Sequence, residues 1–207
     1  MTKIIKYILL AVIICFSIYN SVYIESLTER KKEQKSTAFN AKDFAENFMI
    51  SEVKKSPAIQ ASNFFTGIFS KDLKKYCVLR GKSLGISDDY NFVIQGNATV
   101  IAVEDENVLV TLDANKNQTI RIATDFIFGN TIRDATGIAN IGDFQNTMDF
   151  NNISIELNNI VRERVVPPFK EKVKEGDHLY FKGAIKINIK HPDFESLKVT
   201  PLIINFK

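Results

Sequence analysis

The sequence is poor in the residues from which many active sites are built. Its 207 residues include two cysteines and two histidines. His178 and His191 lie 13 residues apart, and neither an HExxH nor a CxxC motif occurs, so we expect no metal and no cofactor. Cys15 lies inside an apolar run, which leaves Cys77 as the one thiol of the folded part and excludes an internal disulfide there. No catalytic residue can be assigned.

Most of the chain also lacks a surplus of either charge. The net charge is +3, but residues 1–35 hold six basic and three acidic residues. Residues 36–207 therefore keep 21 of the 27 basic and 21 of the 24 acidic residues. A domain that follows a nucleic-acid backbone normally shows a basic face, so we expect no nucleic-acid partner.

A phosphate-binding glycine loop is missing as well. The segment GKSLG at Gly81 is similar to the end of such a loop, but the glycine required five residues before the GK pair is replaced by Tyr76. We interpret the segment as a connection between helices and the first strand. Asp88 and Asp89, shortly after it, are interpreted as a turn.

One long apolar run is present, over residues 4–24. At about 1.5 Å per residue, a helix of this length reaches the roughly 30 Å of bilayer hydrocarbon. No A-x-A cleavage pattern follows, and Ile14 stands before Cys15 where lipidation needs a small residue. The sequence favours an uncleaved transmembrane anchor at 1–25 over a cleaved or lipidated segment. A charged spacer follows at 26–37, and the flanking charges leave the orientation open.

A helical segment is predicted at residues 38–79. Asn40 can cap its first helix, with Asp43 three residues on. Ser56 and Pro57 can begin the second, which would bury Ile59. A third short helix is expected over residues 70–77.

Five strands are predicted in the last part of the chain, residues 80–207. They cover residues 91–105, 108–113, 118–124, 178–190 and 198–207. Gly96 indicates a bulge in the first strand, and Pro201 indicates an edge or an irregular start in the last. Alternation in the third strand places Ile120 and Ile122 inside and Arg121 outside.

A helix is predicted between the third and fourth strands. Asn151 or Asn152 can cap it, Pro167 and Pro168 can end it, and it has one apolar face. That face consists of Ile153, Leu157, Ile160 and Val161. Five strands with a helix in this place are the plan of an OB-type barrel, so we predict an α+β fold, mainly β; a five-stranded sandwich is the alternative.

The connection before this helix contains the candidate site, beginning with FGNTIRDATG at residues 128–137. Gly129 and Gly137 permit positive φ, while Arg133 and Asp134 offer a guanidinium fork and a carboxylate. Arg133 can grip a sugar hydroxyl, a phosphate or a carboxylate. Asp134, Asp143 and Asn146 complete the polar set. Alternatively, Arg133 and Asp134 tie the connection to the barrel, and this structural role is the favoured interpretation.

Several segments together resemble a known family. These are GNTIRDATG, GDFQNTMDF, the LN at 157–158, the GD at 176–177, FKGAIKI and VTPLIINF. They resemble a family of bacterial predicted periplasmic lipoproteins that is catalogued only as a domain of unknown function. The resemblance covers residues 38–207, although this chain lacks a proper lipidation motif. Its signature positions, none with a known role, are Arg133, Asp134, Phe144, Asn146 and Asn158.

The resemblance implies an OB-like domain on the extracytoplasmic side of the bacterial cytoplasmic membrane, with the N-terminus inside, and a gene often found beside sugar ABC transporter genes. We therefore expect a non-enzymatic accessory or binding module, with the membrane, sugar ABC transporter components or a small polar ligand as partners. The alternative is an envelope hydrolase of glycans or phosphoesters, with Asp134 and Asp143 as acid and base. A third hypothesis, binding of single strands, would use Tyr180 and Phe181 for stacking.

Overall fold

The computed structural model describes residues 2–21 and 39–207. The chain divides into two units, residues 1–39 and 40–207, and the first contains helix α1 (Thr2–Ser21). In the part of the chain that the structure describes, no helix is both long and apolar enough to cross a membrane. The transmembrane helix predicted at residues 1–25 is therefore not supported. The spacer predicted at 26–37 lies outside the described residues.

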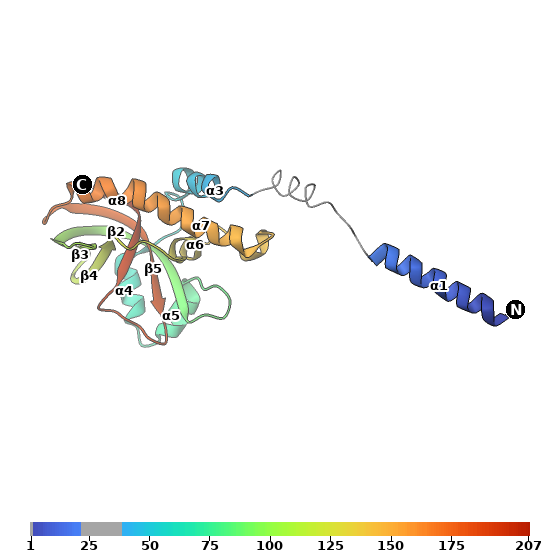
Figure 1. The fold of residues 1–207 in the computed structure, drawn as a ribbon. Coiled ribbons are helices and arrows are strands. Elements are labelled where there is room, and N and C mark those ends of the chain that lie inside the picture. Colours follow the sequence, from blue (N-terminus) through green and yellow to red (C-terminus); the bar gives the residue numbers. More distant parts are fainter. Residues whose placement is uncertain (1, 22–38) are drawn as a thin grey trace. The chain divides into compact units, whose positions relative to one another are not determined.

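Five strands of the second unit close into the predicted barrel (Figure 1). They are β2 (Asp89–Val103), β3 (Asn107–Leu112), β4 (Asn115–Ala123), β5 (His178–Asn188) and β6 (Lys198–Phe206). Strand β2 pairs antiparallel with both β3 and β5, and β6 pairs antiparallel with β5. The parallel pairing of β4 with β6 closes the barrel. Ile120 and Ile122 are buried inside it, and Arg121 lies at its surface, as their alternation predicted.

A sixth strand, β1 (Ile59–Gln60), replaces the start of the second predicted helix. It pairs in parallel with Ile94 and Gln95 of β2. Pairing of β3 with β2 begins only at Ala98, so this part of the β2 edge is left open to another backbone. Because a free edge offers unpaired N–H and C=O groups, Ile59 joins the sheet and helix α4 starts at Ala61 (Ala61–Ile68).

Two irregularities in the strands were predicted, and one of them is present. The pairing of β2 with β5 passes through Gly96 without a shift, so the predicted bulge there is wrong. Gly96 instead allows a close approach, since a Cβ at this position would lie 3.2 Å from the Cβ of Ala61. The irregularity at Pro201 is confirmed, because the register between β5 and β6 shifts opposite it.

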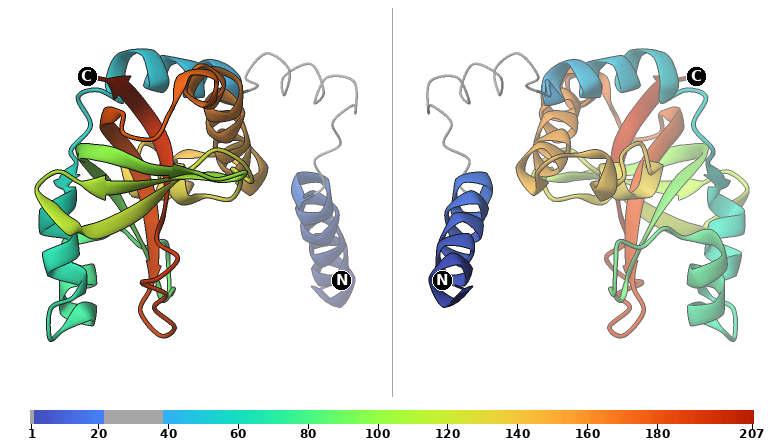
Figure 2. Two further views of the ribbon diagram at one scale, coloured as in Figure 1. Left: turned by 90° about the vertical axis from the view of Figure 1, so that its left-hand side faces the viewer. Right: turned by 90° about the vertical axis from the view of Figure 1, so that its right-hand side faces the viewer.

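The helices of the second unit lie at two ends of the barrel (Figure 2). Helix α3 (Ala41–Asn47) continues into the π-helical turn η1 (Phe48–Glu52) and packs against α7. Asn40 caps α3 as predicted, through its side-chain oxygen and the backbone N–H groups of Lys42 and Asp43. Helix α5 (Leu73–Arg80) starts later than predicted because Asp72 is its cap, and it packs on α4 at the other end.

The long helix between β4 and β5 starts earlier and runs further than predicted. Helix α7 (Thr147–Ile160) is capped by Asn146, and its predicted apolar face is buried. It continues through the π-helical turn η3 (Val161–Val165) into α8 (Val166–Lys172), as Figure 1 shows. Pro167 and Pro168 stand in the first turn of α8, directly after this π-helical turn. The prediction that the prolines end the helix is therefore wrong, because the helical run continues past them to Lys172.

Candidate functional site

The candidate segment forms a short helix, α6 (Thr131–Thr136), that packs on β2, β5 and α7. Gly129 precedes it with φ +83°, and Gly137 ends it with φ +64°, so both glycines have the positive φ expected of them. The Lys82 ammonium donates a hydrogen bond to the Thr136 carbonyl at 2.6 Å. A cation at a helix C-terminus is favourable, so the GKSLG segment stabilises α6.

Arg133 is buried, with 1% of its surface exposed. Its Nε donates to Oδ1 of Asp134 at 2.8 Å, and its Nη1 donates to the Phe150 carbonyl at 3.1 Å and to Oδ1 of Asn151 at 3.2 Å. The guanidinium carbon lies 3.6 Å from the centre of the Phe150 ring. These contacts join α6 to α7 and occupy the guanidinium on several sides, as in the structural role considered for it.

Three other signature residues fasten α7 to its surroundings. Oδ1 of Asn146 accepts the Asp149 backbone N–H at 2.8 Å, which caps the helix. The Phe144 ring lies against Phe150 and Phe44, with centroids 5.8 and 6.5 Å apart. Nδ2 of Asn158 donates to the Gly129 carbonyl at 2.8 Å.

Asp143 stands apart from this group. It ends the short 3₁₀ helix η2 (Ile141–Asp143) and is exposed. Its carboxylate accepts a hydrogen bond from Asn140 at 3.3 Å.

A cavity of about 400 Å³ opens beside the first turn of α6. Of the predicted site residues, Asp134 and Gly129 line it, and Arg133 and Asp143 do not. The polar and aromatic side chains that line it include Ser87, Asp89, Phe128, Asn130, Asp134 and Lys186. They come from the loop before β2, the start of β2, strand β5 and the residues around the start of α6.

The charges of this cavity are paired with one another or with neighbours. Asp89 lies 3.3 Å from the Lys186 ammonium and also accepts from Nδ2 of Asn188 at 2.8 Å. The side chain of Asp134 is 14% exposed and is paired with Arg133. Phe128 differs from these residues because 74% of its surface is exposed at the cavity rim. The site thus combines paired charges with an accessible aromatic ring.

Sequence reasoning missed most of this cavity. Asp89 was assigned to a turn, but it begins β2 and carries the ion pair described above. The sequence around Lys186 shows only the alternation of a strand and does not indicate that this residue lines a cavity. The available clue was Phe128, an aromatic residue directly before a glycine in a polar connection.

A family profile described as "Predicted periplasmic lipoprotein (DUF2291)" matches residues 12–205. The chain belongs to this family. Its membership confirms the resemblance and agrees with an extracytoplasmic, membrane-associated location. No curated protein matches the sequence.

A solved structure supports the fold. The chain is similar to the crystal structure of an OB-fold protein from Thermotoga maritima, with a TM-score of 0.73 and 23% sequence identity. The similarity covers 83% of this chain and all of the other. The predicted OB-type architecture is confirmed, and this likeness is one of fold alone.

Proposed function

We propose that the protein is a non-enzymatic, extracytoplasmic binding module that holds a small polyhydroxylated ligand, such as a sugar, in the cavity beside Asp134. The observation that carries the proposal is the exposed ring of Phe128 at the rim of a cavity lined by two carboxylates, two amides and two hydroxyls. The volume of about 400 Å³ falls within the range of small-molecule sites, roughly 300–1,000 Å³.

The side chains of this cavity suit a sugar. Asp89 and Asp134 accept hydrogen bonds, Lys186 donates them, and the amide of Asn130 does both. Sugar hydroxyls also both donate and accept, so several such contacts form at once. The flat apolar face of Phe128 can cover the C–H face of a sugar ring.

We place this binding activity at the bacterial cell envelope. The family's description as periplasmic lipoproteins supports attachment to the membrane through the N-terminal segment. The resemblance stated above supports sugar ABC transporter components as partners. In this proposal, the domain binds its ligand outside the cytoplasmic membrane and serves sugar uptake without chemical conversion.

The other two hypotheses find less support. A glycoside hydrolase needs two carboxyl groups about 5–9.5 Å apart across a cleft, and Asp143 does not line the cavity that Asp134 lines. Asp89 does line it but is paired with Lys186. Phe181, considered above for base stacking, is buried in the barrel and offers no face to a nucleic acid.

A thermal-shift screen with glucose, galactose, xylose, ribose and their phosphates tests the proposal. A sugar present at 100 times its dissociation constant stabilises the native state by about 2.7 kcal/mol and raises Tm. Phe128→Ala should abolish that rise without changing the Tm of the free protein, because the ring is exposed. The matched control is Phe126→Ala, which removes another exposed ring that does not line the cavity.

Two outcomes would reject this function. One is the absence of any rise in Tm with millimolar sugars or sugar phosphates. The other is a rise that Phe128→Ala and Lys186→Gln both leave intact.

A further inference from the structure

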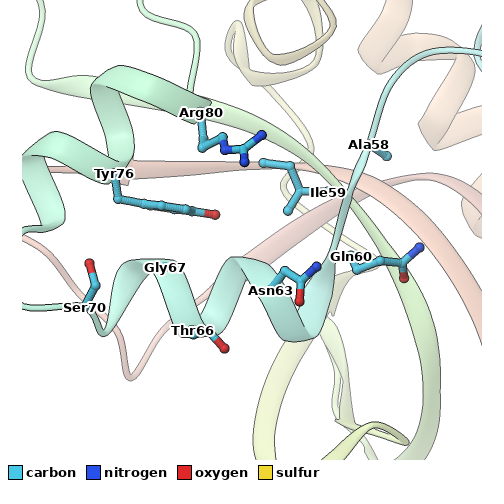
Figure 3. Close-up of a pocket in the computed structure, with 9 residues that line it drawn as sticks. All are labelled: Ala58, Ile59, Gln60, Asn63, Thr66, Gly67, Ser70, Tyr76 and Arg80. Atoms are coloured by element: carbon cyan, nitrogen blue, oxygen red, sulfur yellow. The ribbon is translucent and has the colours of Figure 1, made fainter.

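A second cavity, of about 640 Å³, lies between β1, α4 and α5 (Figure 3). It shares none of its lining residues with the cavity beside Asp134. The lining includes Ile59, Asn63, Gly67, Ser70, Tyr76 and Arg80. None of these residues belongs to the signature positions discussed above, so the proposed sugar site leaves this cavity unexplained.

The Tyr76 ring is fixed at one side of this cavity. It stacks on Phe92, with centroids 5.9 Å apart and an interplanar angle of 11°. It also lies against Gly67, where a Cβ would come within 2.1 Å of the ring. Gly67 therefore has to be a glycine for the ring to occupy this position.

Among the residues that line this cavity, Tyr76 alone has a buried polar side-chain atom without a hydrogen-bond partner. Its hydroxyl oxygen is buried and has no hydrogen-bond partner among the residues that the structure describes. Figure 3 shows it pointing away from α5, into the space between Ile59 and Asn63. A buried hydroxyl without a partner destabilises a protein by about 1–3 kcal/mol, so a structural role alone gives no reason for it. Burial raises the pKa of Tyr76, which keeps the hydroxyl protonated and able to donate at neutral pH.

Arg80, the last residue of α5, supplies a positive charge to the same cavity. Within the described part of the chain it makes no hydrogen bond and no ion pair, in contrast to the buried Arg133. In Figure 3 its guanidinium extends in the same direction as the Tyr76 hydroxyl. A guanidinium is suited to a carboxylate, which it can bind through two parallel N–H groups.

We propose that this cavity binds a small carboxylate with an apolar body. Arg80 pairs with the carboxylate, the Tyr76 hydroxyl donates to it, and the apolar body lies along Ala58 and Ile59. Arg80 is the only cation among the residues that line the cavity, so the lining matches a monoanion better than a multiply charged phosphate.

The test uses the full chain and titration calorimetry with 4-phenylbutyrate and its neutral analogue 4-phenylbutanamide. The acid should bind at least tenfold more tightly than the amide. Arg80→Gln and Tyr76→Phe should each weaken binding of the acid by about 10- to 100-fold, the range for a lost hydrogen bond to a charged group. The control is Lys74→Gln, which removes one positive charge from an exposed position of α5 outside the cavity and should leave binding unchanged.

Thermal melting separates binding from folding. Tyr76→Phe should leave Tm unchanged or raise it, because the variant removes a buried hydroxyl without a partner. A fall in Tm of several degrees in this variant would show that the hydroxyl serves the fold. The proposal is also rejected if acid and amide bind equally, if neither Arg80→Gln nor Tyr76→Phe weakens the acid, or if millimolar 4-phenylbutyrate does not bind.

Discussion

Two buried cations show how single residues hold this barrel to its helices. Arg133 fastens α6 to α7 through two hydrogen bonds and a stack on Phe150, and it forms an ion pair with Asp134 of its own helix. Lys182 is equally buried, and its ammonium donates to the carbonyls of Ser56 at 2.5 Å and Lys54 at 3.3 Å. Burial lowers the pKa of Lys182, but the two carbonyls give its protons acceptors. Both charges therefore serve to join segments that are distant in the sequence.

Replacement of Arg133 should accordingly be a stability defect. We expect Arg133→Ala to lower the free energy of unfolding by about 3–5 kcal/mol, because the change leaves Asp134 without its partner. Arg164→Ala is the control, since that arginine pairs with Glu46 at the surface and its loss should change stability by less than about 1 kcal/mol. Urea denaturation measures the free energy of unfolding of both variants. Equal losses in the two would contradict the structural role of the buried Arg133.

At the scale of elements, the helix between β4 and β5 has a defined start. Asn146→Ala should destabilise the protein by about 1 kcal/mol, because it removes the acceptor for the Asp149 N–H. Asn152→Ala, at one of the positions where the sequence suggested a cap, should be neutral or slightly stabilising, since Asn152 lies inside α7 and alanine favours helix. Chemical denaturation of the two variants measures both effects, and the midpoint of Asn146→Ala should be the lower one. A lower midpoint for Asn152→Ala would place the cap at Asn152.

At the scale of the whole molecule, closure of the barrel depends on Gly183. A Cβ there would lie 2.3 Å from Cγ1 of Val199 and 2.5 Å from the Thr200 carbonyl oxygen, both on β6. Because β6 also pairs with β4, displacing it would open the barrel. We expect Gly183→Ala to destabilise the protein by about 1–3 kcal/mol. Gly142→Ala is the control, because a Cβ at Gly142 meets no atom within 4 Å. Calorimetric melting should show a loss of stability in Gly183→Ala and no comparable loss in Gly142→Ala. A similar loss in both variants would reject this role of Gly183.

The sequence by itself determined the five strands, the interposed helix and its apolar face. Those features follow from alternation and helical periodicity, which are local properties of the chain. The caps and ends of the helices were harder to predict, because Asn146, Asn151 and Asn152 all have side chains that can cap a helix. In the folded chain only Asn146 lies directly before α7, where it accepts the Asp149 N–H. Pro167 and Pro168 also suggested an end to this helix, whereas the chain continues past them as α8.

The tertiary structure alone decided β1 and both cavities. Strand β1 forms because β3 leaves part of the β2 edge unpaired. The residues around Ile59 have no pattern that predicts this pairing. Asp89, Asp134 and Lys186 come together only when the barrel closes. The sequence also does not show that the Tyr76 hydroxyl is buried without a hydrogen-bond partner. Periodicity shows which face of an element is buried; what lies opposite that face depends on residues far away in the chain.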